Sequence, residues 1–188
     1  MDELVAFLRA RRDEDALWAA EASRWDDGAS IEGGAHWQWV DPETDEVVTL
    51  NPDQDEFVNG DRLRVSLRSR EEAMWGEFRR MLPQFVIHSA EEVRTAVGGH
   101  IARHDPARVL REAEAKRKIV EDYASALSER QAVRAEIRKI LHTDPDAFGE
   151  LSRQENALID KAEALLPIVR IVSTVYADHP DYREEWRP

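Results

Sequence analysis

The sequence predicts a mainly α-helical protein of the α+β class, with a small antiparallel sheet or hairpin in an N-terminal head and a long antiparallel helical hairpin after it. Two long amphipathic stretches each begin at an Asp-Pro pair, in which Asp caps a helix and Pro occupies its first turn. Upstream of them lie short aromatic and β-branched segments that alternate with polar residues, which is typical of strands. We therefore expect three parts, which are a helical head with a small sheet at 1–104, a helical hairpin at 105–177 and a C-terminal tail at 178–188.

Residues 2–22 are predicted to form the first helix. Acidic side chains at its start favour a helix there, because they lie at the positive end of the helix dipole. Its apolar patch comprises Leu4, Val5, Phe7 and Leu8. Leu17 and Trp18 continue the patch after a charged stretch. We expect Trp18, like Trp75 further along the chain, to be part of the core, since a buried tryptophan adds much apolar area to a thin core.

A β-hairpin is predicted over residues 36–50. HWQWV and EVVTL are aromatic and β-branched, and DPETD between them has the composition of a turn. A third strand is predicted where Leu63, Val65 and Leu67 alternate with arginines. The arginine face lies either near residues 41–61, which hold eight acidic and no basic side chains, or in solvent. Loops are expected at 26–35 and 51–61.

Two shorter helices are predicted between the sheet and the helical hairpin. One covers residues 70–82 and is stopped by the proline that follows it. The other begins near Ala90, at the capping box of residues 89–92. Gly98 and Gly99 weaken this second helix, by roughly 1 kcal/mol each relative to alanine.

Two long helices are predicted next, one from Pro106 to about Leu141 and one from Pro145 to about Ala177. They should pack antiparallel, because the turn between them is short. The second helix carries positions that alternate at four- and three-residue spacing, as in the heptad seam of a coiled coil. Pro167 should kink or break this helix. The seam comprises Leu151, Glu155, Leu158, Ala162, Leu165, Val169, Val172 and Tyr176.

The second long helix has more apolar faces than one partner helix can cover. Ile168, Ile171 and Val175 lie off the seam, so the rest of the chain or another subunit must cover them. We therefore expect a non-enzymatic protein-interaction module whose protein partner is a second copy of itself. Trp186 either docks the tail or is exposed for a partner. The expected interaction residues are Leu165, Ile168, Ile171, Val175 and Trp186.

Composition excludes several classes of protein and favours others. The 188 residues carry a formal net charge of −13 and no cysteine, which removes disulfides, thiolate metal sites and cysteine nucleophiles. The sequence contains no run of eighteen apolar residues, so no segment is expected to span a membrane. The N-terminus is acidic and does not resemble a secretory signal. We therefore expect a cytoplasmic protein. An acidic surface disfavours direct nucleic-acid binding. It also raises an alternative function, an acidic DNA mimic that acts as a decoy for a phage-defence or DNA-binding protein.

A divalent metal site is the other alternative, and it would make the protein a metal-dependent hydrolase. His100 and His104 are four residues apart, so both imidazoles could bind one ion, and His179 and Asp181 could add ligands. The competing interpretation is a pair of structural histidines at a helix end. The sequence contains neither a nucleophile elbow nor a phosphate-binding glycine loop, so no catalytic residue is assigned and no other cofactor is expected.

Charged residues on the helices allow two further interpretations. The pairs Glu14 with Glu21 and Glu114 with Glu121 have the seven-residue spacing of carboxylates that could hold magnesium on helices. Residues 103–118 hold six basic and three acidic side chains. They could bind a phosphate or an acidic partner, or they could pair with the acidic residues of their own helix and of the 41–61 region.

Three segments resemble an uncharacterised family of small actinobacterial and actinophage proteins. They are LVAFLRARRDED at 4–15, HIARHDPARVLREAEAKRKIVE at 100–121 and YADHPDYREEWRP at 176–188. The resemblance covers about a quarter of the chain, at both ends and at the centre. It implies a bacterial or phage cytoplasmic protein, and it supplies no activity and no catalytic residue.

Overall fold

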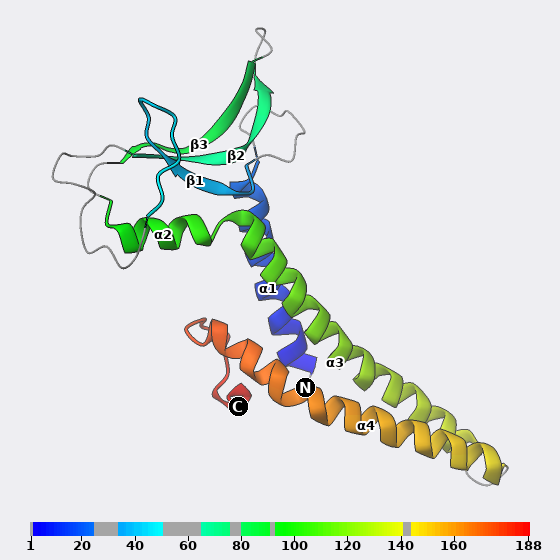
Figure 1. Cartoon of the computed structure of the whole chain (residues 1–188). Helices are drawn as coiled ribbons and strands as arrows, with labels where there is room; N and C mark the ends of the chain where they lie inside the picture. Colours follow the sequence, from blue (N-terminus) through cyan, green and yellow to red (C-terminus); the bar gives the residue numbers. More distant parts are fainter. Residues whose placement is uncertain (1, 25–33, 51–64, 76–79, 91–92, 141–143) are drawn as a thin grey trace. The chain divides into compact units, whose positions relative to one another are not determined.

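The computed structural model describes residues 2–24, 34–50, 65–75, 80–90, 93–140 and 144–188 (Figure 1). The fold is mainly α-helical with a small antiparallel sheet, as predicted. The described residues divide into two compact units. We call residues 15–112 the sheet unit, and residues 1–14 with 113–188 the helical unit.

The described residues of the sheet unit contain a three-stranded antiparallel sheet in the order β1-β2-β3. The strands are β1 (Trp37–Val40), β2 (Val65–Trp75) and β3 (Arg80–Ala90). Trp39 is paired with Leu67 across β1 and β2, and these two side chains form a small buried core with Val65. The predicted third strand is therefore confirmed from Val65 onward, and its earlier residues lie outside the described part of the chain.

The predicted hairpin of residues 36–50 is present, although its second arm is short. Val40 and Val47 form an antiparallel bridge, and Val48 donates its backbone N–H to the Trp39 carbonyl at 2.9 Å. The other edge of β1 pairs with β2 along its whole length. The turn itself is present, because the Asp41 side chain accepts the backbone N–H of Glu43 at 2.7 Å. Arg68 on β2 donates to Asp45 at 2.7 Å, so this arginine does face the acidic segment.

The predicted helix at 70–82 is wrong, because residues 70–75 belong to β2 and residues 80–82 to β3, and residues 76–79 lie outside the described part of the chain. The backbones of Glu72 and Pro83 are paired, as are those of Ala73 and Leu82. Pro83 is tolerated because β3 is an edge strand, in which a missing N–H can face away from the sheet. A short apolar run fits the residue spacing of a helix as well as that of a strand. Pairing with a neighbouring strand decides which of the two forms.

The helix predicted from a capping box at 89–92 begins later than expected. Ser89 and Ala90 end β3, and helix α2 runs from Thr95 to Arg103. Its N-cap residue is Arg94, which has extended backbone angles and makes no side-chain capping hydrogen bond. The capping-box prediction is therefore wrong, since β3 extends the sheet to the residue where the helix was expected to start.

Both long helices begin where the sequence predicts. Helix α3 spans Pro106–Ile140 and helix α4 spans Pro145–Ser173. Asp105 accepts the N–H of Arg108 at 2.8 Å, and Asp144 accepts the N–H of Ala147 at 3.0 Å, so both aspartates act as N-caps. Helix α4 continues through Pro167, which therefore does not break it, and short 3₁₀ turns follow at Thr174–Tyr176 and Glu184–Trp186.

The helical unit packs α3 and α4 against the start of the first helix. Helix α1 spans Asp2–Ala22, which are the predicted bounds, and its first two turns are buried in the helical unit as expected. Tyr123 and Val169 are almost completely buried at the centre of this core. Arg130 and Arg134 of α3 both approach Glu155 of α4, at 3.8 and 3.9 Å, as expected for a helical hairpin. The remaining buried members are Leu4, Val5, Phe7, Leu8, Val120, Ala126, Ala162 and Trp186.

Tryptophan positions depart from the prediction. Trp18 lies on the part of α1 that belongs to the sheet unit, and 70% of it is exposed, so the prediction that it is a core residue is wrong. Trp186 is only 7% exposed and packs on Phe7, with 4.9 Å between ring centroids. Trp75 lies in β2, and its side chain is outside the described part of the chain.

Candidate functional site

Helix α4 presents two parallel seams, and the first of them is buried. The predicted heptad positions Leu158, Ala162 and Val169 are buried. Leu165, Val172 and Tyr176 are partly buried and pack against the same core. The four- and three-residue spacing of this seam therefore turns one face of α4 toward α1 and α3.

The second seam is displaced by one residue and lies in solvent. Ile168, Ile171 and Val175 are 44%, 58% and 64% exposed, and they lie together on one face of the helix. The same four- and three-residue spacing continues toward the start of the helix through exposed small and charged side chains. We call this surface the α4 stripe; it comprises Ala157, Lys161, Ala164, Ile168, Ile171 and Val175.

Two of the five predicted interaction residues are part of the core instead. Leu165 is partly buried beside the helical core, and Trp186 is buried against Phe7. Sequence analysis did not identify Ala157, Lys161 and Ala164 as surface residues of this stripe, because they are not large and apolar. The signal that could have found them is the spacing itself, since each lies one position before a residue of the buried seam.

The four predicted metal ligands do not form one site in either unit. His100 and His104 belong to the sheet unit, whereas His179 and Asp181 belong to the helical unit. His179 lies 2.5 Å from the Arg11 guanidinium, and Asp181 donates its backbone N–H to His179 at 3.1 Å. Within the described ranges, no three or more metal-ligating side chains gather at one point.

The imidazoles of His100 and His104 lie together at the end of α2. Their ring centroids are 4.0 Å apart, and His104 Nδ1 lies 2.9 Å from the carbonyl oxygen of His100. They line a cleft of about 270 Å³ with Arg103 and Arg108. Among the described residues that line this cleft there is no carboxylate to complete a metal site, and the Arg103 guanidinium disfavours a divalent cation there.

Two arginines of the cationic segment at 103–118 are paired with acidic residues of their own helix. Arg108 donates to Glu112 at 2.6 Å, and Arg117 donates to Glu114 through two nitrogens. These contacts follow the i,i+4 and i,i+3 spacing of a helix surface. They support the prediction of pairing within the helix at these positions.

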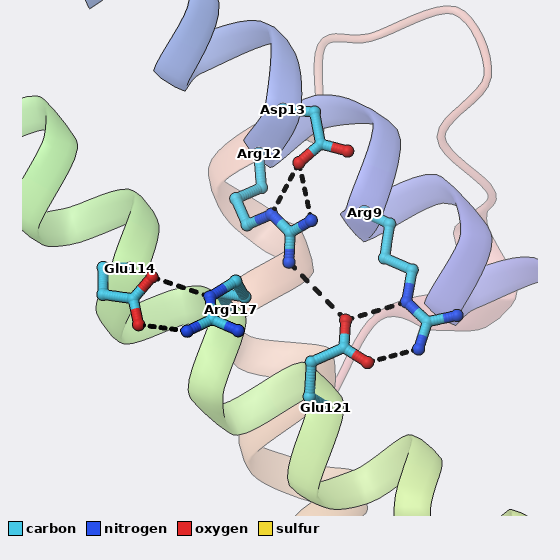
Figure 2. Close-up of polar contacts among 6 residues, drawn as sticks. All are labelled: Arg9, Arg12, Asp13, Glu114, Arg117 and Glu121. Atoms are coloured by element: carbon cyan, nitrogen blue, oxygen red, sulfur yellow. Dashed lines mark hydrogen bonds and ion pairs between the residues drawn. The ribbon is translucent and has the colours of Figure 1, made fainter.

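An ion-pair cluster joins α1 to α3 in the helical unit, and Figure 2 shows it. Arg9 donates from Nε to Glu121 Oε1 at 2.8 Å and from a second nitrogen to the other carboxylate oxygen. Arg12 donates to Asp13, and its Nη1 lies 3.6 Å from Glu121. Glu121, one of the carboxylates considered for magnesium, is therefore already neutralised by arginine.

Hydrogen bonds from arginine lower the pKa values of two carboxyl groups, those of Glu121 and Glu114. Hydrogen bonds from Arg9 hold the pKa of Glu121 below its usual range, and the charge of Arg9 adds to the effect against a weaker opposing contribution from burial. Hydrogen bonds from Arg117 lower the pKa of Glu114 in the same way. Both groups are thus held as anions that bind arginine.

No helix within the described residues is both long enough and apolar enough to cross a bilayer.

The fold and the α4 stripe together define a small α+β protein that exposes an aliphatic seam along one long helix. The chain belongs to a family of unknown function, DUF6221, whose model matches residues 1–188. Neither the curated proteins nor the solved structures contain a match to this chain.

Proposed function

We propose that this protein is a non-enzymatic interaction module that self-associates through the α4 stripe. The observation that carries the proposal is the alignment of Ile168, Ile171 and Val175 on one exposed face. Single exposed aliphatic residues are common on protein surfaces, but a row at heptad spacing is the pattern of a helix that receives another helix. A second copy covers such a face without requiring a different partner.

The physical gain comes from removing these side chains from water. Each large aliphatic side chain contributes about 1.5 to 3 kcal/mol when it becomes fully buried. The gain is smaller here because the three residues are already partly covered, and ordering the interface opposes it. We therefore expect a dimer of moderate, micromolar affinity.

The proposed setting is the cytoplasm of a bacterium or of a phage-infected cell, by the family resemblance of the three sequence segments. The metal-dependent hydrolase stays a prediction, because the described residues supply two imidazoles without a third ligand. The acidic DNA mimic also stays a prediction. It rests on the net charge of −13 and on the acidic 41–61 region, much of which is outside the described part of the chain.

Sedimentation equilibrium of the wild-type protein and of Ile171→Asp tests the proposal. At about 50 µM we expect the wild-type protein to be mainly dimeric and the variant to be monomeric, because a carboxylate would have to enter the apolar interface. Asn156→Asp adds the same charge to an exposed position on another face of α4, and it should leave the dimer intact. Circular dichroism confirms that each variant is folded. A wild-type protein that sediments as a monomer rejects the proposal.

A further inference from the structure

We infer that the second copy docks on the α4 stripe in an antiparallel orientation, with Ile168 of one copy against Ile171 of the other. This inference rests on the proposed self-association and adds its geometry. The stripe contains two sets of positions seven residues apart, which are Lys161, Ile168 and Val175 on one side and Ala164 and Ile171 on the other. In an antiparallel helix pair, each set packs against the other set of the partner.

The part of the stripe from Ala164 to Val175 is symmetric about the midpoint between Ile168 and Ile171. A two-fold axis between Ile168 and Ile171 places Ala164 of each copy against Val175 of the other copy. A small side chain then faces a larger one in both outer layers, which lets the two helices approach evenly. A parallel pair would instead place Val175 against Val175 and Ala164 against Ala164. The two helices would then have to lie further apart at Val175 than at Ala164.

Charges on either side of the segment from Ala164 to Val175 select the antiparallel orientation. They are Lys161 within the stripe and Asp178 beyond its last member. The same axis places Lys161 of each copy against Asp178 of the other copy. Both side chains are exposed, and neither has an ion-pair partner among the residues that the structure describes. A parallel pair would bring Lys161 to Lys161 and Asp178 to Asp178, which is repulsive at both ends.

Asp178 can take part because the chain keeps a helical path beyond the end of α4. Thr174 has φ and ψ of −64° and −20°, and Ala177 has −60° and −25°, which are right-handed helical values. This path is the 3₁₀ turn at Thr174–Tyr176, and a 3₁₀ helix has three residues per turn, so Asp178 follows Val175 by one such turn at the end of the stripe. The ionic ends and the aliphatic centre form one continuous surface.

Disulfide trapping can measure this orientation directly, because the natural chain has no cysteine. In the antiparallel dimer the double variant A164C/V175C brings each new thiol near its partner on the other copy. The two positions lie about 16 Å apart along their own helix, too far for a disulfide within one chain. We expect oxidation to convert this variant to a covalent dimer, whereas Val175→Cys alone should give little crosslink.

Charge exchange provides an independent measurement. Lys161→Glu and Asp178→Lys should each weaken the dimer by about fivefold or more, corresponding to about 1 kcal/mol for an exposed ion pair. The double variant K161E/D178K should restore the wild-type dissociation constant, because it exchanges the two charges across the axis. Restoration would not be expected if either residue acted only on the folding of its own chain.

The outcomes separate this inference from the proposed function. Abundant crosslinking of Val175→Cys alone indicates a parallel pair and overturns the orientation, while self-association stands. A dimer by sedimentation in which A164C/V175C does not crosslink also overturns it, because the stripe would not be paired in this register. A wild-type monomer rejects both proposals.

Discussion

At the scale of single residues, Gly98 is required by close packing and not by backbone flexibility. The Trp39 indole donates to the Gly98 carbonyl at 2.8 Å, so α2 lies directly on the sheet. A Cβ atom at Gly98 would lie 2.3 Å from a methyl carbon of Leu50 and 2.8 Å from one of Val93. The same atom at Gly99 would have only an ordinary contact, at 3.7 Å.

This difference predicts opposite effects of one substitution at neighbouring positions. Gly98→Ala should lower the free energy of unfolding by about 1 to 3 kcal/mol, because the added methyl group overpacks against Leu50 and Val93. Gly99→Ala should be neutral or should raise it by up to about 1 kcal/mol, since alanine is the better helix former. Urea unfolding of both variants measures the two effects. Equal effects would contradict this account of Gly98.

At the scale of elements, the ion pair between Arg9 and Glu121 holds α1 on α3. The contact uses two parallel hydrogen bonds, which is the stronger geometry for an arginine and a carboxylate. Both side chains remain partly in water, with 44% and 38% exposed, so the contribution to stability is modest. The apolar core supplies most of the stabilisation, and the ion pair helps to fix the position of α1 along α3.

The lowered pKa of Glu121 makes this contribution depend on pH. Glu121→Gln should reduce the free energy of unfolding by about 0.5 to 1 kcal/mol at pH 7. A carboxyl group whose folded pKa is depressed stabilises the fold above its ordinary value of 4.5 and loses that contribution as the pH falls through the folded value. The difference between wild type and variant should therefore shrink below that pH.

Chemical denaturation at several pH values between neutral and acidic measures the difference. Glu163→Gln is the matched control, because Glu163 is exposed on α4 and has no ion-pair partner among the described residues. A constant gap between wild type and Glu121→Gln at every pH would show that the ion pair does not contribute in this way.

At the scale of the whole molecule, the helical unit is built from both ends of the chain. The tail places Trp186 and Tyr182 around Phe7 of α1, and Arg183 donates to Glu3 at 2.6 and 3.0 Å. Contacts between residues so far apart in sequence can form only after the chain closes a long loop. The tail is therefore a structural component of this unit.

Trp186→Ala should consequently be among the most destabilising single changes in the tail. We expect a loss of about 3 to 5 kcal/mol, because the indole is buried and its removal leaves a cavity against Phe7. Arg187→Ala, which removes only an exposed contact with Glu184, should cost less than about 1 kcal/mol. Thermal and urea unfolding compare the two. A loss below 1 kcal/mol for Trp186→Ala would show that the tail is not part of the core.

Local signals alone determined the long helices. The N-caps at Asp105 and Asp144 and the spacing of the α4 seam act within one or two turns, so their outcome does not depend on distant residues. The first helix was predicted to the residue for the same reason. The exposed face of Ile168, Ile171 and Val175 was also visible in this spacing.

Tertiary structure decided the features that depend on a partner remote in sequence. Residues 70–75 and 80–82 are strands because β2 and β3 pair with each other, although their apolar pattern alone also fits a helix. Burial of Trp186 and exposure of Trp18 depend on what packs against each ring, which composition cannot reveal. A helix cap depends only on a few consecutive residues, so the sequence determines it locally. Strand pairing and burial depend on which residues are neighbours in space, and only the folded chain provides those neighbours.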